Sequence, residues 1–125
     1  MQLIGHPLVP TQPLYEIKKV CTIKETPSNA VLLFAYDEDL IIHCQQNKLS
    51  FALHVTSIQE AIVGNGAGAS ILIASYEKAQ ELQALADHYL FDAKIAVCLP
   101  DDQAIEDATK LGVDMAILPQ GIYHT

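Results

Sequence analysis

Arginine is missing from this sequence. All seven of its basic residues are lysine, whereas fifteen residues are acidic, so the net charge is −8. Arginine is the usual bidentate partner of phosphates and of guanine edges, and affinity for nucleic acids and anionic membranes comes from basic residues. We therefore expect neither a nucleic acid nor a membrane to be a partner of this chain.

Cysteine is scarce, and long apolar runs are absent. The three cysteines, Cys21, Cys44 and Cys98, are widely spaced and include no CxxC pair, which argues against a disulfide framework and against a structural zinc site. No apolar run approaches the roughly 18 residues that a membrane helix needs. The first residues also lack the basic and apolar regions of a secretory signal. These absences predict a cytoplasmic protein.

Apolar residues, by contrast, are plentiful. Of the 125 residues, 50% are hydrophobic and 18% are charged, and the mean hydropathy is +0.22. This composition predicts one folded domain over residues 1–125, with residues 1–13 as a proline-rich arm or loop. A domain of this size leaves much of its surface outside, so we expect a homo-oligomer that covers part of the apolar surface.

Short apolar runs recur along the chain, and each is continuous instead of alternating. This pattern is typical of strands buried on both faces of a parallel sheet. The runs that predict strands are Val31–Ala35, Phe51–Val55, Ile71–Ala74, Ile95–Leu99 and Met115–Leu118. Helical spacing between the runs predicts helices, and residues that commonly cap helices precede them: Asp37, Ser57, Ser75 and Asp101.

Glycines are expected to end these helices. Gly68 and Gly112 each precede a strand by a few residues, and Asn47 is expected to end the first helix in the same way. The run Gly64–Gly68 follows a helix and precedes a strand. It therefore predicts a helix stop and not a phosphate-binding loop, which would follow a strand.

An internal repeat gives the clearest indication of fold. Phe51–Val55 and Ile95–Leu99 are equivalent strands of two copies, and in each copy a cap, a helix, a glycine and a further strand follow in register. Each copy has about the size of a right-handed βαβ crossover. The repeat predicts an α/β domain built from βα units.

Two architectures are compatible with this repeat. The favoured one is a three-layer α/β/α sandwich of flavodoxin type, with five or six mainly parallel strands. The alternative is a (βα) half-barrel, which would expose one face of its sheet and would have to pair with another copy. A closed TIM barrel needs eight units and a longer chain. In the less regular N-terminal part, Leu14–Val20 is expected to be an edge strand and Thr22–Thr26 a helical turn.

Acidic residues follow two of the predicted strands. In parallel α/β sheets, ligands bind where the strands end. Asp37, Asp39 and Asp101 are therefore candidate ligands for a divalent cation such as Mg²⁺, the cofactor that carboxylate oxygens would suit. The alternative is that these carboxylates cap helices and interact with the helix dipoles.

His54 and Cys98 occupy equivalent positions of the repeat, near the ends of two strands. They are interpreted either as a thiolate–imidazole pair or as buried core residues. His54, Asp37 and Asp101 are the candidate catalytic residues, and the terminal Tyr123–Thr125 is expected to be a frayed end. The other polar residues expected near the strand ends are candidate ligand-binding residues, namely Tyr36, Thr56, Ser75, Tyr76 and Gln120.

These features support two hypotheses about function. The first is a self-associating module that binds a small-molecule ligand or a protein, because the chain is apolar and shows no complete catalytic set. The second is a small metabolic enzyme with an acidic site, dependent on a divalent metal, at the carboxyl ends of the strands. The strand–helix pattern is common to many α/β families, so no residue role is transferred from any of them.

Overall fold

The computed structural model describes residues 1–124, and these residues form one sheet in which every strand pairing is parallel. The strand order is β1-β7-β6-β5-β4-β3-β2-β8. The strands are β1 (Gln2–Ile4), β2 (Leu14–Glu16), β3 (Val31–Ala35), β4 (Phe51–His54), β5 (Ile71–Ile73), β6 (Lys94–Cys98), β7 (Met115–Ile117) and β8 (Ile122–His124).

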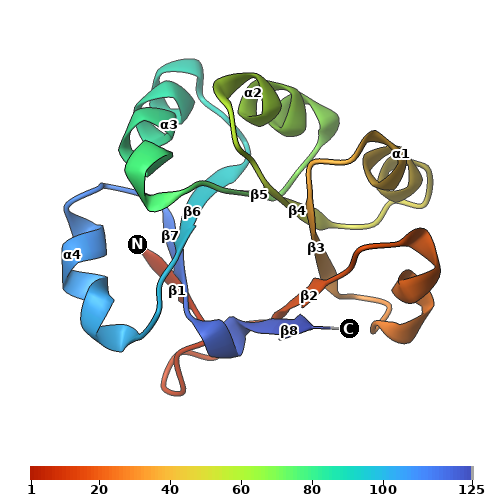
Figure 1. Ribbon diagram of the computed structural model, residues 1–125, viewed down its shortest axis with the longest axis horizontal. Coiled ribbons are helices and arrows are strands. Elements are labelled where there is room, and N and C mark those ends of the chain that lie inside the picture. Colours follow the sequence, from red (N-terminus) through yellow and green to blue (C-terminus); the bar gives the residue numbers. More distant parts are fainter. Residues whose placement is uncertain (125) are drawn as a thin grey trace.

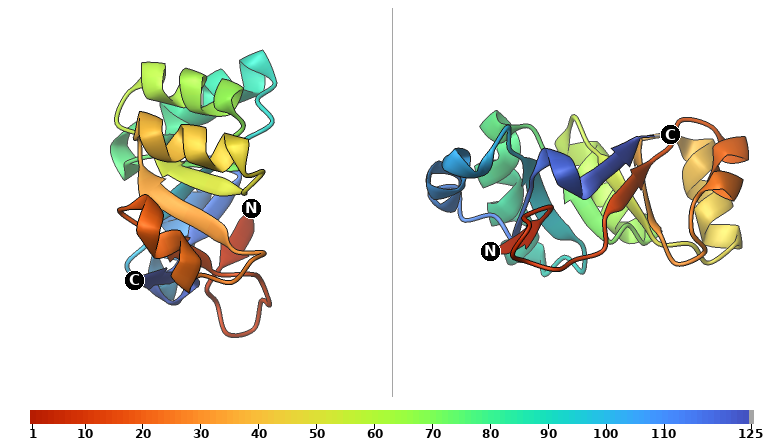
Figure 2. Two further views of the ribbon diagram at one scale, coloured as in Figure 1. Left: turned by 90° about the vertical axis from the view of Figure 1, so that its right-hand side faces the viewer. Right: turned by 90° about the horizontal axis from the view of Figure 1, so that it is seen from below.

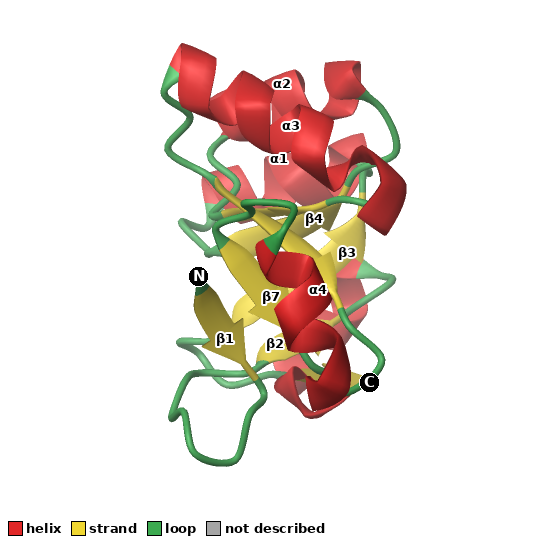
Figure 3. Cartoon of the chain, turned by 90° about the vertical axis from the view of Figure 1, so that its left-hand side faces the viewer, coloured by secondary structure: helices red, strands yellow, loops and turns green. Residues whose placement is uncertain are grey.

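Helices connect most of these strands. The α-helices are α1 (Glu38–Gln46), α2 (Ile58–Ala67), α3 (Tyr76–Tyr89) and α4 (Ile105–Thr109), and the 3-10 helices are η1 (Val20–Glu25), η2 (Asp102–Ala104) and η3 (Pro119–Gly121). Figure 1 shows the strands curving around a centre with the helices on the outer side. In the side view of Figure 3, α4 lies in front of β7. Within residues 1–124, no helix is long and apolar enough to span a membrane.

The predicted parallel α/β sheet of βα units is confirmed, and of the two architectures the chain adopts the half-barrel. The sheet has eight strands, more than the five or six expected. The length of the chain suffices because many strands are only three residues long and some connections contain no α-helix. Short η3 alone joins β7 to β8, for example, and Figure 2 shows that β8 then lies beside β2.

Two apolar clusters hold the curved sheet, one on each face. The outer cluster packs strands against helices and includes Phe34, Leu53, Leu72 and Val97. The inner cluster fills the concave face; its buried members are Ile4, Leu14, Leu33, Ala52, Ile71, Ile73, Ala96, Met115 and Ile117. Successive residues of a strand point to opposite faces, so burial on both faces explains why the apolar runs are continuous.

Most of the predicted helix boundaries are confirmed. The Oδ1 atom of Asp37 accepts hydrogen bonds from the amides of Asp39 and Leu40, at 2.9 and 3.2 Å, and Ser57 caps α2. Gly68 ends α2 with a φ of +104°. Asn47 follows α1 without a left-handed backbone, so its predicted conformation was wrong: Lys48 has the positive φ, of 56°.

The N-terminal part differs more from the prediction. The strand expected at an edge over Leu14–Val20 is shorter, because β2 ends at Glu16 and the chain enters η1 at Val20, and it is not an edge, because β2 pairs with both β3 and β8. Within the predicted arm, Gln2–Ile4 forms β1 and pairs with β7. β1 is an edge of the sheet and β8 is the other edge, and no strand pairing joins the two among the described residues.

A close backbone contact holds these two edges near each other. The amide of Leu118 donates to the Ile4 carbonyl at 2.8 Å, just before η3. Gly5, with a φ of +96°, lies so near Gly121 that a Cβ atom on Gly5 would be 2.5 Å from the Gly121 nitrogen. Only glycine meets both the conformational and the steric requirement at this position.

We predict that Gly5→Ala destabilises the fold by about 1–3 kcal/mol or more, because it combines a strained backbone with a clash against backbone atoms. Gly112→Ala is the matched control, since Gly112 shares a positive φ, +69°, but has open space around it. The control should lose only the conformational part, about 1–2 kcal/mol, and so less than Gly5→Ala. Urea unfolding followed by circular dichroism measures both, and equal stabilities of the two variants would contradict the role of Gly5.

Candidate functional site

The carboxyl ends of the strands meet at one end of the half-barrel, because all strands are parallel (Figure 1). Seven strands end on a residue that lies two positions after a member of the inner apolar cluster or a residue packed against it, and in five of them that final residue is outside the cluster. Side chains two apart in a strand share a face, so the five final residues extend from the concave face. We term this set the mouth: Glu16, Ala35, His54, Cys98 and His124.

Apolar side chains lie beside the polar residues of the mouth. Leu33, Ile73 and Ile117 are the register partners of Glu16, His54 and Cys98, and all three are buried on the concave face. Ala35 and Cys98 are exposed to solvent, so the mouth is open. A ligand at the mouth would meet hydrocarbon and titratable groups side by side.

Glu16 and His124 form a hydrogen-bonded pair between side chains of the mouth. The two residues are register partners on β2 and β8, and Oε1 of Glu16 lies 2.9 Å from Nδ1 of His124. Their side chains are 29% and 69% exposed, respectively. The bond orients the imidazole ring and leaves Nε2 as the ring nitrogen for a ligand.

The negative charge of Glu16 also changes the pKa values of two other residues of the mouth, His54 and Cys98. Burial lowers the pKa of His54, and the charge of Glu16 partly opposes that shift. Burial raises the pKa of the Cys98 thiol, and Glu16 raises it further. Although Cys98 is exposed on its solvent side, its sulfur is therefore a neutral thiol at neutral pH, and His54 is a neutral imidazole.

The predicted acidic residues serve mainly as helix caps. Asp37 caps α1, and Asp101 accepts the amide of Gln103 at the start of η2, at 3.0 Å. Asp39 is exposed in the first turn of α1. In the part of the chain that the structure describes, no three His, Cys, Asp or Glu side chains are arranged to hold a metal ion. Of the candidate catalytic residues, only His54 belongs to the mouth.

The predicted binding residues are spread around the rim instead of converging. Thr56 donates both its amide and its hydroxyl to the Glu60 carboxylate, at 2.9 and 3.1 Å, so α2 already engages it. Tyr36 lines a cavity of about 330 Å³ beside Ile17 and Asp37. The remaining three are exposed at the start of α3 or in η3: Ser75, Tyr76 and Gln120.

Glu16 and His124 are not among the site residues predicted from the sequence. The lysines that follow Glu16 suggested an edge strand, and the last residues were expected to be frayed, whereas β8 extends to His124 and Thr125 lies outside the described residues. The available signal was the alternation Leu14-Tyr15-Glu16 and Ile122-Tyr123-His124, in which a polar side chain follows an apolar one on the same face.

A scan against protein-family models and a search of curated proteins find no match to this chain. A function for the mouth is therefore inferred from its own geometry and charge.

We predict that His54 makes the stability of the fold sensitive to acid. Its pKa is lower in the folded chain than its ordinary value of 6.5, so the unfolded chain binds the proton more readily. This contribution to stability is present above about pH 6.5 and is lost as the pH falls towards the lowered pKa. His54→Gln should therefore reduce the loss of Tm between about pH 7.5 and about pH 5.5.

The control for this measurement is His88→Gln, on the exposed side of α3. It should leave the pH dependence of Tm as in the parent chain. If His54→Gln also left that dependence unchanged, burial of the His54 imidazole would not explain the acid sensitivity.

Proposed function

We propose that the protein is a small-molecule-binding module that takes a compact cationic ligand, such as a primary amine, at the mouth. The observation that carries the proposal is the position of Glu16. Its carboxylate is bonded to His124 and exerts its charge on both His54 and Cys98. A cation at this point would interact with the Glu16 carboxylate and with the His124 imidazole beside it.

The chemistry of the mouth favours a cation over an anion. No lysine belongs to the mouth, and the chain has a net charge of −8, so an anion would meet repulsion without a partner. A neutral imidazole offers a nitrogen lone pair, which accepts a hydrogen bond from an ammonium group. The neighbouring apolar side chains of Leu33, Ile73 and Ile117 suit a short carbon skeleton attached to that group.

Disulfide probes of different charge test the proposal, because Cys98 lies within the mouth. The thiolate of Cys98 attacks one sulfur of the probe, which forms a mixed disulfide and releases the other half as a thiol. Cystamine is the cationic probe, 2-hydroxyethyl disulfide is neutral and dithiodiglycolate is anionic. Cys21 is the internal reference, since it is exposed in η1 on a chain segment that also contains Lys19 and Lys24.

We predict that, relative to Cys21, Cys98 reacts about tenfold or more faster with cystamine than with dithiodiglycolate, a preference of about 1.4 kcal/mol. Glu16→Gln should abolish most of this preference, and added salt should weaken it. Mass spectrometry of peptides gives the rate at each cysteine. Equal charge preferences at Cys98 and Cys21, or a preference that survives Glu16→Gln, would contradict a cation site.

A separate observation favours self-association through α2. Glu60 is the only charged residue of this helix, and it is engaged by Thr56. Ile62 and Val63 are nevertheless 48% and 44% exposed. Exposed apolar side chains on one side of a helix are usually covered by another element, and in Figure 3 no other part of the described chain covers the outer side of α2.

Gly66 adds to this argument because the fold itself does not require it. Gly64 is explained by its contact with Leu53 and Leu72, whereas a Cβ on Gly66 would meet open space. A glycine within a helix costs about 0.5–1 kcal/mol relative to alanine. Gly66 and Ile62 lie four residues apart on one face of α2. In a dimer with two-fold symmetry, Ile62 of one copy would fit into the space that Gly66 of the other copy leaves because it has no side chain.

We predict that the parent chain forms a dimer and that Ile62→Lys makes it monomeric, because the substitution places a charge in an apolar contact. Val20→Lys is the matched control, a β-branched residue of similar exposure, 40%, in η1. Light scattering after size exclusion measures the mass. A monomeric parent chain at high concentration, or equal effects of both substitutions, would contradict association through α2.

A further inference from the structure

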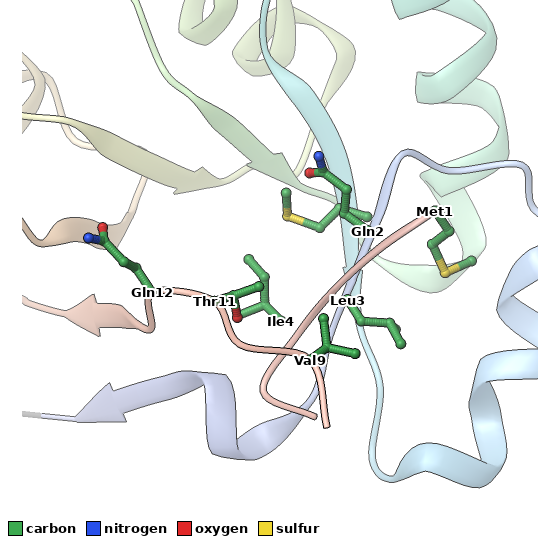
Figure 4. Close-up of a pocket in the computed structure, with 8 residues that line it drawn as sticks. Met1, Gln2, Leu3, Ile4, Val9, Thr11 and Gln12 are labelled. Carbon is green, nitrogen blue, oxygen red and sulfur yellow. The ribbon is translucent and has the colours of Figure 1, made fainter. Parts of the chain in front are cut away.

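A further cavity lies at the opposite end of the half-barrel from the mouth. It occupies about 440 Å³ where the edge strand β1 faces the segment that leads into β2 (Figure 4). Gln2 and its register partner Met115 begin their strands nearby, so the cavity belongs to the amino ends of β1 and β7. Its lining residues are Met1, Gln2, Leu3, Ile4, Val9, Thr11, Gln12 and Met115. We term it the seam cavity.

The lining of the seam cavity carries no charged side chain. Five of the eight residues are apolar, and the other three, Gln2, Thr11 and Gln12, are neutral groups that form hydrogen bonds. The chain as a whole has fifteen acidic residues and seven lysines, so these uncharged side chains contrast with the rest of the sequence. None of them offers a counter-charge to a charged ligand, which would lose part of its hydration here.

The backbone of β1 directs one amide and one carbonyl towards the cavity. The amide of Gln2 donates to the Asp114 carbonyl and the Leu118 amide donates to the Ile4 carbonyl, both at 2.8 Å. In parallel pairing, alternate residues bond to opposite sides of a strand. The amide and carbonyl of Leu3 therefore point away from β7, towards the unpaired edge at the cavity.

Prolines stiffen the wall of the cavity opposite β1. Pro7, Pro10 and Pro13 flank or interrupt the segment that contains Val9, Thr11 and Gln12, and each proline fixes its own φ angle. A wall with few accessible conformations loses little entropy when a ligand binds. The proline-rich arm thus forms a pre-shaped side of the cavity.

We propose that the seam cavity binds an uncharged, largely apolar small molecule that carries an amide or a similar donor–acceptor pair. The apolar body would lie against Leu3, Ile4 and Met115, and the polar group would pair with Leu3 or with a glutamine amide. The cavity volume falls within the usual range of small-molecule sites, about 300–1,000 Å³. This site is separate from the mouth and takes a ligand of different charge.

An extended peptide is a less suitable occupant. Addition of a strand to a sheet edge draws its affinity from a row of main-chain hydrogen bonds. β1 has three residues, and only Leu3 directs its peptide groups to the free edge. Typical strands have about five or six residues, so a peptide would gain too few hydrogen bonds here.

The neutral fluorescent probe N-phenyl-1-naphthylamine tests the proposal, because it combines two apolar rings with one N–H donor. We expect its emission to rise and to saturate at one probe per chain. Val9→Asp should weaken binding about tenfold or more by placing a charge in the neutral lining. Val20→Asp, a valine exposed outside the cavity, should leave the affinity unchanged within about twofold.

A variant that fills the seam cavity tests the proposal without adding a charge. Thr11→Trp should occupy the cavity and abolish saturable binding, and circular dichroism should show that each variant is folded.

Prior modification of Cys98 with cystamine should not change the affinity for the probe, since the mouth lies at the other end. Failure of the cation site would thus leave this result unaffected.

Three outcomes would overturn the proposal. The first is a signal that does not saturate, and the second is an equal loss of binding in Val9→Asp and Val20→Asp. The third is an affinity that falls as the protein concentration rises, which would show that a second copy of the chain occupies the cavity.

Discussion

The structure depends on the inner apolar cluster that fills the concave face of the sheet. Short strands of three to five residues have few hydrogen bonds each, so the curved sheet needs apolar contacts on both faces. Leu14, Leu33 and Ile117 come from distant parts of the sequence and meet in this cluster. Because side chains alternate along each strand, this contact also fixes which residues extend beyond the cluster at either end.

The two ends of the half-barrel differ in chemistry for that reason. At the carboxyl ends, the alternation places Glu16, His54, Cys98 and His124 beside buried residues of the inner cluster. At the amino ends of β1 and β7, neutral side chains and the peptide groups of Leu3 surround a cavity. One end therefore suits a cation and the other an uncharged molecule, and the packed interior separates them.

The N-terminal arm shows how a segment without regular structure contributes to a site. Its prolines suggested a loop, and most of it is one, but it also contains β1 and forms a wall of the seam cavity. The close contact of Gly5 with Gly121 connects this arm to η3 and so to β8. The two edges of the sheet are thus held by a backbone contact, where a closed barrel would have strand pairing.

By itself, the sequence determined the local elements. The apolar runs, the caps Asp37 and Ser57 and the stop at Gly68 depend on neighbouring residues only, so they could be predicted from spacing and residue type. His54 could be placed near a strand end for the same reason. Only the tertiary structure decided between sandwich and half-barrel, because that choice depends on the curvature of the sheet and on which faces the helices cover. It also decided the pairing of Glu16 with His124, since those residues become neighbours only when β8 returns beside β2.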